Sequence, residues 1–323
     1  MIDRRRALIG GALLAASSRA ARAEWSPSRP VTIIVPYPAG GGTDVLARIV
    51  ARDLSASLRG NAVVENAPGA SGAIGSRRVA KADPDGHTLL VTTNQTHATN
   101  ISLMKDGGGY HPIDDFTVLG QLADLQHLLV VRADLAAKSA ADVVALAKSS
   151  TKLTCGSTGI GSASHLTMEL FKAKTSLDLV HVPYRGAAPL LQDLVGGRID
   201  MAFATVPTVL GQVQGNQVRA LAVASPAPCP QLPGLPTLAG EGIAGVEADA
   251  WIAAFGPAKL PPEITRRYAS ALRAMIAQAD IADNIRTLGM LPNWREPTAF
   301  AAFQRQDIDR WAAIIRAASV AAE

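Results

Sequence analysis

The chain has 323 residues, of which 48% are hydrophobic and 18% charged, and its formal net charge is +4. Residues 1–23 hold five arginines and one aspartate, a net of +4, so the remainder of the chain is neutral overall. A neutral chain gives no reason to expect nucleic acid or an anionic membrane as a partner, and about 300 globular residues suffice for two domains with separate cores.

The first 23 residues have the pattern of an export signal. Arg4–Arg6 form a basic start, residues 7–16 form an apolar run, and Ala21-Arg22-Ala23 is a small-x-small cleavage site. The apolar run is shorter than the ~20 residues that a membrane-spanning helix needs. We therefore expect cleavage after Ala23, a mature chain in the periplasm and no membrane-spanning segment. The general and twin-arginine export routes both stay open.

Along the mature chain, apolar runs alternate with amphipathic stretches, which predicts an α/β protein with largely parallel sheets. The expected strands are 31–35, 62–65, 87–92, 128–132, a short one opening 153–171, 177–182, 199–203, 218–223 and 251–255. The expected helices are 43–58, one ending near 82, 139–148 with Ser139 as its cap, one closing 153–171, 187–195, 262–279 and 298–318. The proline-rich stretch 226–236 has no regular pattern.

Two connecting strands divide the chain into two expected lobes. The first lobe spans 24–127 and is completed by 253–323, and the second lobe, 128–252, is inserted between these parts. We therefore expect the chain to cross between the lobes twice.

Two Gly-rich loops each follow a predicted strand and precede a predicted helix. The first is Tyr37-Pro-Ala-Gly-Gly-Gly-Thr-Asp44, and the second is Ser157-Thr-Gly-Ile-Gly-Ser-Ala-Ser-His165. N–H groups in the first turn of a helix lack internal acceptors and lie at its positive end, so such ends bind anions. Two of them predict a small acidic ligand held between two lobes. Tight turns with positive φ would account for the glycines alone.

Several segments, in their order and spacing, resemble the periplasmic solute-binding receptors of tripartite tricarboxylate transporters, also called Bug-type receptors. The resemblance runs from about Trp25 to Val320. The segments that carry it are Arg29-Pro-Val-Thr-Ile-Ile-Val-Pro-Tyr-Pro-Ala-Gly-Gly-Gly-Thr-Asp44, Val64-Glu-Asn-Ala-Pro-Gly-Ala-Ser-Gly72, Asp83-Pro-Asp-Gly-His-Thr-Leu-Leu90, Gly159-Ile-Gly-Ser-Ala-Ser-His165, His181-Val-Pro-Tyr-Arg-Gly186, Arg219-Ala-Leu-Ala-Val223 and Arg310-Trp-Ala-Ala-Ile-Ile315.

The resemblance implies a two-lobed periplasmic binding protein fold (type II-like), each lobe a sheet flanked by helices, that closes on a small carboxylate in the cleft between the lobes. It implies a receptor without catalytic activity or cofactor, with membrane transporter subunits as partners. Carried over by motif, the ligand-binding residues are Tyr37, Ala39, Gly41, Gly42, Thr43 and Asp44 in the first lobe, and Ser157, Gly159, Gly161, Ser162, His165, Tyr184, Arg185, Gly186 and Thr205 in the second.

Three of these residues have a second interpretation, and a fourth departs from the family pattern. Asp44 is as well suited to stabilising its own helix dipole as to contacting a ligand. Arg185 can form a forked pair with a carboxylate or remain a solvated loop arginine, and Tyr37 can cover an aliphatic ligand chain or pack on its neighbouring prolines. Thr205 stands where the family often has Asp or Asn, which argues against ligands with an amino group.

A sensor subunit of a two-component signalling system would use the same binding module, and the sequence does not separate it from a transporter receptor. Other classes of function fit the sequence less well. A secreted hydrolase would need a nucleophile such as Ser157, but the loop lacks the GxSxG elbow. The partial fingerprint Gly159-x-Gly161-x-x-Ser164 lacks its third glycine, which disfavours a dehydrogenase. Cys155 and Cys229 can pair or stay inert, and neither has metal-ligand spacing.

Overall fold

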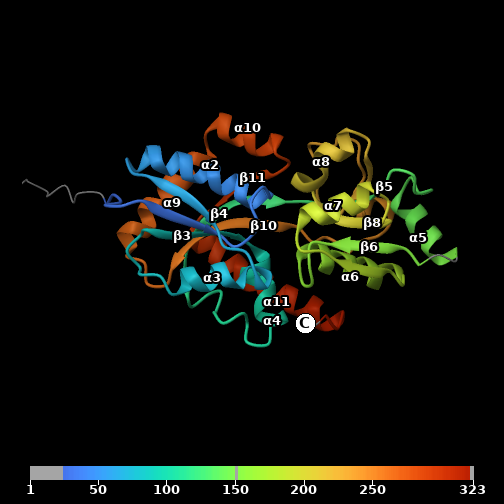
Figure 1. Cartoon of the computed structure of the whole chain (residues 1–323), viewed down its shortest axis with the longest axis horizontal. Coiled ribbons are helices and arrows are strands. Elements are labelled where there is room, and N and C mark those ends of the chain that lie inside the picture. Colours follow the sequence, from blue (N-terminus) through green and yellow to red (C-terminus); the bar gives the residue numbers. More distant parts are fainter. Residues whose placement is uncertain (1–24, 150–151, 321–323) are drawn as a thin grey trace, which may run out of the picture.

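The computed structural model describes residues 25–149 and 152–320. Two sheets, each covered by helices, lie side by side along the longest axis of the molecule (Figure 1). The predicted export signal, residues 1–23, lies outside the described residues. A search of the described part finds no helix with the length and hydropathy that crossing a membrane requires.

The first lobe, defined here as the six-stranded sheet with its helices, has the strand order β11-β4-β10-β3-β1-β2. Its strands are β1 (Val31–Val35), β2 (Ala62–Asn66), β3 (Thr88–Thr93), β4 (Phe116–Leu125), β10 (Ala250–Pro257) and β11 (Leu291–Arg295). Its helical elements are α2 (Gly42–Ser57), η2 (Ala70–Gly72), α3 (Ala73–Ala80), η3 (Gln95–Thr99), α4 (Asn100–Leu103), α9 (Pro262–Ile276), α10 (Ala279–Thr287) and α11 (Pro297–Ala317).

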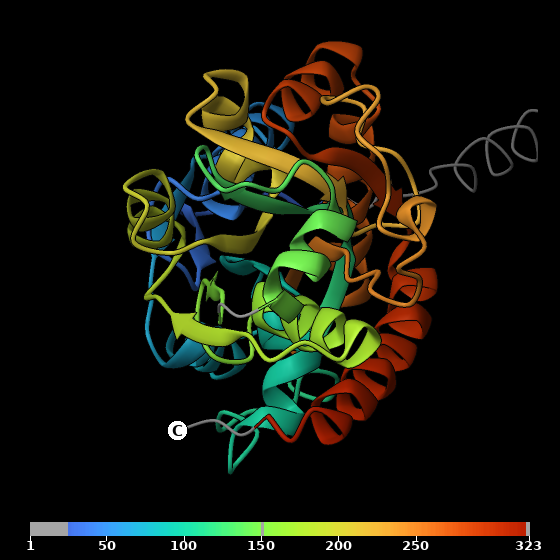
Figure 2. The ribbon, with the colours of Figure 1, turned by 90° about the vertical axis from the view of Figure 1, so that its right-hand side faces the viewer.

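Both faces of this sheet are covered, which explains its continuous apolar strands. Successive side chains of a strand point to opposite faces. In β1, Val31 and Ile33 therefore join the core formed with α2 and α9, whereas Ile34 joins the core formed with α3 and α11. The long helix α11 runs along the first lobe to its border with the second (Figures 1 and 2).

The second lobe, defined as the five-stranded sheet with its helices, has the order β7-β6-β8-β5-β9. Its strands are β5 (His127–Arg132), β6 (Thr154–Ser157), β7 (Val180–Pro183), β8 (Met201–Thr205) and β9 (Val218–Val223). Its helical elements are α5 (Ala140–Ser149), α6 (Ala163–Thr175), α7 (Ala187–Val195), α8 (Val206–Gln214) and η4 (Ala239–Glu241). Ser139 caps α5 as predicted, because its Oγ accepts a hydrogen bond from Asp142 N at 3.1 Å.

The chain passes between the two sheets at adjacent places. β4 ends at Leu125 in the first sheet, and β5 begins two residues later in the second. The return runs from the end of β9 to the start of β10. Ser225 Oγ joins the two crossings, since it accepts a hydrogen bond from Gln126 Nε2 at 3.1 Å and donates one to Asp249 Oδ2 at 2.8 Å.

Two features of the predicted architecture were wrong. The sheets are mixed rather than largely parallel: β10 is antiparallel to β3 and β4, and β5 is antiparallel to β8 and β9. β5 begins the second sheet after the first crossing, and β10 rejoins the first sheet after the second crossing. Each runs antiparallel to both of its neighbouring strands. The helix predicted over 262–279 ends at Ile276, and α10 follows as a separate helix.

Candidate anion-binding site

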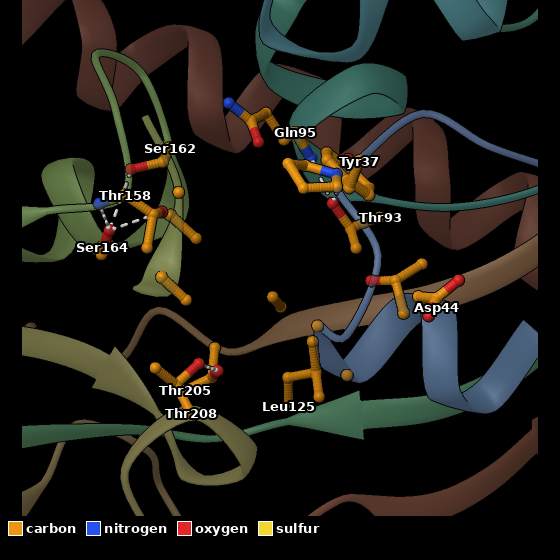
Figure 3. Close-up of a pocket in the computed structure, with 18 of the residues that line it drawn as sticks. Tyr37, Asp44, Thr93, Gln95, Leu125, Thr158, Ser162, Ser164, Thr205 and Thr208 are labelled. Atoms are coloured by element: carbon orange, nitrogen blue, oxygen red, sulfur yellow. Dashed lines mark hydrogen bonds between the residues drawn. The ribbon is translucent and has the colours of Figure 1, made fainter. Parts of the chain in front are cut away.

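A cavity of about 450 Å³ lies between the lobes, at the two chain crossings (Figure 3). Leu125, His127 and Ala250 belong to the crossing strands and form part of its wall. The rest of the wall comes from loops that follow β1, β3, β6, β7 and β8, and ligands of open α/β sheets bind at such carboxyl ends of strands. These loops contribute Tyr37 to Asp44, Thr93 to Gln95, Thr158, Ser162 to Ser164, Arg185 to Pro189, Thr205 and Thr208.

The loop after β1 leaves the positive end of α2 uncovered at the cavity. Gly41 is the N-cap residue in an extended conformation, and no side chain accepts a hydrogen bond from the first turn. Gly40 has φ +87°, a left-handed conformation that favours glycine. Backbone N–H groups of α2 are therefore available to an anion.

The carboxylate of Asp44 holds this loop in place. It accepts hydrogen bonds from Gly40 N at 2.9 Å, from Arg48 Nε and Nη2 at 3.0 Å, and from Asn66 Nδ2 at 2.9 Å. Burial alone would raise the pKa of Asp44, but these donors outweigh it and lower the pKa. In Figure 3 the side chain is turned away from the open centre of the site, and its oxygens are already satisfied by protein donors.

The end of β3 brings polar side chains to the wall that the sequence did not single out. Thr93 and Gln95 face the site in Figure 3, and Asn94 also lines it. The Tyr37 hydroxyl lies 2.7 Å from Thr93 Oγ1 and 3.3 Å from Thr92 Oγ1, so its partners are protein hydroxyls. Burial raises the pKa of Tyr37, which keeps the phenol neutral.

In the second lobe, hydroxyls surround the start of α6. Ser162 is its N-cap, with Oγ accepting from His165 N at 3.3 Å and donating to Gly159 O at 2.7 Å. Ser164 Oγ accepts from Thr158 N at 3.0 Å. Thr158, Ser162 and Ser164 all lie on the cavity wall (Figure 3).

A stacked pair of histidines supports this loop from behind. His165 Nδ1 accepts from Gly161 N at 3.0 Å, and the rings of His165 and His181 stack with centroids 4.0 Å apart. His181 Nε2 lies 2.7 Å from Ser157 Oγ, and Ser157 is fully buried. Burial and the neighbouring His165 lower the pKa of His181 to about 4, so the ring is neutral at neutral pH.

The next two loops present two further helix ends. Gly186, with φ +110°, is the N-cap of α7, and Thr205 is the N-cap of α8; neither helix has a side-chain cap. Thr205 Oγ1 lies 2.9 Å from Thr208 Oγ1. Arg185 is exposed at this wall, and no ion-pair partner for it occurs within the described ranges.

The structure brings ten of the fifteen predicted ligand-binding residues to the wall. They are Tyr37, Ala39, Gly41, Gly42, Thr43, Asp44, Ser162, Arg185, Gly186 and Thr205. The other five, Ser157, Gly159, Gly161, His165 and Tyr184, lie outside the lining. Tyr184 donates instead to Asp193 Oδ2 at 2.8 Å, and burial together with that carboxylate raises its pKa to about 12.

The polar composition of the wall defines the chemistry of the site. Three helix N-termini without side-chain caps and one arginine supply positive potential, and the carboxylate of Asp44 is bound to Arg48. Within the described ranges, no group of three or more His, Cys, Asp or Glu side chains is placed to hold a metal ion. Cys155 and Cys229 are both buried and unpaired. The fold and the site are those of a two-lobed binding protein for a small anion.

Comparison with known proteins agrees with this class. A family model described as "Tripartite tricarboxylate transporter family receptor" matches residues 46–320. The chain is similar to Rpa4515 of R. palustris, solved with adipate (33% identity, TM-score 0.87, 91% of this chain and 99% of that one). It is also similar to the periplasmic binding protein BugD (32%, 0.84, 92% and 100%) and to MatC of Rhodopseudomonas palustris with bound malate (30%, 0.83, 90% and 99%). The chain belongs to the tripartite tricarboxylate transporter receptor family.

Proposed function

We propose that this chain is a periplasmic receptor without catalytic activity. It captures a small organic acid, a di- or tricarboxylate or a similar compound, between its lobes and delivers it to the membrane subunits of a tripartite transporter. The observation that carries the proposal is the convergence of uncapped helix N-termini from both lobes on one cavity. Adipate and malate, bound by Rpa4515 and MatC, are acids of this class.

In this proposal each lobe contributes part of the ligand's coordination. Backbone N–H groups of α2 hold one carboxylate, and the starts of α7 and α8 with the Arg185 guanidinium hold a second acidic group. The 15 ligand-binding residues named from the sequence then divide into those on the wall and those, such as Ser157 and His165, that shape the loop behind it.

The proposed class of ligand follows from the charge of the described cavity wall, which offers no free carboxylate to a positively charged ligand group. An ammonium group on a ligand needs a carboxylate partner, and the oxygens of Asp44 are already occupied. The position after β8 carries Thr205, which is uncharged. We therefore propose plain carboxylates rather than amino acids as ligands.

The first experiment is a thermal-shift panel of mono-, di- and tricarboxylates, with and without amino groups, on protein that has been unfolded and refolded to remove bound ligand. A ligand at ~100 times its Kd adds ~2.7 kcal/mol of stability. A shift with plain dicarboxylates supports the proposal. A shift with amino acids alone contradicts the role given to Thr205, and no shift contradicts the carboxylate site.

Arg185→Ala tests the charged contact directly. We expect weaker binding of a dicarboxylate in calorimetry with unchanged melting temperature of the free protein, since the side chain is exposed. Arg185→Lys keeps the charge but not the planar fork, and serves as the matched control. Unchanged affinity in Arg185→Ala would remove this residue from the site.

A secreted hydrolase is the alternative from a different class of function, and substitution of Ser157 tests it. Ser157 lies 2.7 Å from His181 Nε2, but it is fully buried and outside the cavity lining. We expect no turnover of small esters by the wild type or by Ser157→Ala. Turnover that Ser157→Ala abolishes would overturn the receptor proposal.

A further inference from the structure

A chain of hydroxyl groups runs from the cavity wall into the first lobe. Thr93 Oγ1 lies 2.7 Å from the Tyr37 hydroxyl, which lies 3.3 Å from Thr92 Oγ1. Thr92 Oγ1 lies 2.6 Å from Thr96 Oγ1, and Thr96 Oγ1 lies 2.9 Å from His97 Nδ1. Thr93 is half-buried at the cavity, whereas Thr96 and His97 are completely buried. The chain therefore links a surface that a ligand can touch to an imidazole that it cannot.

The surroundings of His97 determine where its proton resides. Its ring packs against Phe116 and Phe255 with centroids 4.4 and 4.2 Å away, and Nε2 is buried without a hydrogen-bond partner. Burial lowers the pKa of His97 to about 3, so the ring is neutral and carries one proton. A buried N–H without an acceptor is rarer and costlier than an unused lone pair. The proton therefore belongs on Nδ1, where Thr96 accepts it.

This proton fixes the direction of every bond in the chain, because each hydroxyl has a single proton to donate. Thr96, accepting from His97, donates to Thr92 at 2.6 Å, which is nearer than its other acceptor, Thr93 O, at 3.3 Å. Thr92 is fully buried, and its hydroxyl contacts among the described residues are Thr96, which already donates to it, and Tyr37, so its own proton goes to Tyr37. The proton of Tyr37 then goes to Thr93.

The series of hydroxyl hydrogen bonds ends at Thr93, whose own proton is an unused donor. Its Oγ1 also accepts from Gln95 N at 3.3 Å. Its own proton has no acceptor in the part of the chain that the structure describes, and in Figure 3 the side chain lies at the open site. The opposite direction would leave an unpaired N–H at His97 Nε2.

We propose that His97 is a positioning residue: through Thr96, Thr92 and Tyr37 it fixes the Thr93 hydroxyl as a donor to an anionic group of the ligand. The inference rests on the proposed carboxylate function. It adds an explanation of how the first lobe favours ligand groups that accept hydrogen bonds over groups that donate them. A carboxylate, which only accepts, matches this donor, while an ammonium or an N–H group does not. Polarisation along the chain strengthens the last bond.

The first test reads the tautomer of His97 in the ligand-free, full-length wild-type protein. Nitrogen-15 NMR distinguishes a protonated from an unprotonated ring nitrogen. We expect the proton on Nδ1 across pH 5–8. A proton on Nε2 would overturn the inference, whether or not the protein binds carboxylates, so this outcome is separate from failure of the proposed function.

The second test measures affinity for adipate, and for malate as a second probe, by calorimetry. Thr93→Val removes the donor, and a hydrogen bond to a charged group is worth ten- to hundredfold in affinity. His97→Leu is expected to weaken binding several-fold, and His97→Asn, whose amide can donate from near the Nδ1 position, is expected to restore it. Tyr37→Phe is expected to behave as His97→Leu does.

Tyr110→Phe is the matched control. The Tyr110 hydroxyl donates to Thr96 O at 2.6 Å in the same buried region but is outside the hydroxyl chain. We expect its removal to lower the melting temperature without changing affinity. Equal affinities of His97→Leu and wild type, or an equal loss in Tyr110→Phe and Tyr37→Phe, would contradict the inference. If wild type binds neither acid, the proposed function fails for these ligands, and the tautomer decides the inference.

Discussion

Gly289 is placed where the two lobes touch beside the cavity, and its replacement tests whether this contact is needed for binding. It follows α10 in a left-handed conformation, φ +82°, and the start of α8 in the second lobe packs against it. A Cβ atom at this position would lie 2.9 Å from Val206 Cγ1 and 3.0 Å from Pro207 N. Gly289→Ala therefore forces the two lobes apart at this point.

The two costs of the substitution can be separated. Left-handed backbone costs alanine about 1–2 kcal/mol wherever it occurs, and this part affects the free protein. The clash costs about 1–3 kcal/mol, as overpacking does elsewhere, and it is relieved when the lobes part. We therefore expect roughly five- to 150-fold weaker ligand binding from the clash alone.

Gly242→Ala provides the control, because Gly242 has φ +83° at the end of η4 and a Cβ there would meet no atom within 4 Å. Melting temperature of the free proteins, calorimetry with adipate and small-angle scattering with and without ligand form the assay. Gly289→Ala should bind more weakly than Gly242→Ala and compact less on binding. Equal affinities in the two variants would refute the reasoning that this contact belongs to the ligand-bound arrangement.

Three further predictions follow from buried polar groups. Asp44→Asn should weaken binding and lower the melting temperature by an amount equivalent to about 1–3 kcal/mol. Because the pKa of Asp44 is lowered by folding, its contribution is present above the unfolded value of about 4 and is lost as pH falls below it; acid-melting profiles check this. Asp249, whose pKa burial raises to about 7, has the opposite sign: stability falls as pH rises from about 4 to 7, so Asp249→Asn should raise the melting temperature more at pH 8 than at pH 5. Burial raises the pKa of Cys155 to about 12, so the native protein should resist iodoacetamide at this residue and the denatured protein should react, as mass spectrometry would show.

The sequence identified elements whose pattern is local. β1, α7 and β9 have the predicted bounds, because short apolar runs and a helix that ends at Gly196 are signals contained in a few residues. β4 was missed because Gly120, at φ +138°, and the polar Gln121 interrupt its alternation. Its pairing with β10, more than a hundred residues away, has no local signature.

The same distinction applies to the site. The loop after β1 was found because three successive glycines before a helix are visible in the sequence. Thr93 and His127 were not predicted. Thr93 ends a strand and His127 begins one, and they become part of the cavity wall only because of where the other strands lie. Ser157 and His165 had the residue types of a site, but the structure uses them to shape the loop behind it.

In the proposed binding mode, partial charges from both lobes account for release of the ligand as well as for its capture. One helix N-terminus contributes about 0.3–1 kcal/mol toward an exposed anion and more when partly buried, so the proposed binding mode needs donors from both lobes. The lobes already meet at two places, where Gly289 packs against Pro207 and where Thr99 Oγ1 lies 3.3 Å from Gly161 O. The lobes can be in contact or parted. A ligand that bridges α2 and α7 binds more tightly when the lobes are in contact, and it shifts the equilibrium toward contact by this difference in affinity. Parting the lobes removes one set of donors and returns the acid to a weakly held state, which suits a receptor that must pass its ligand on.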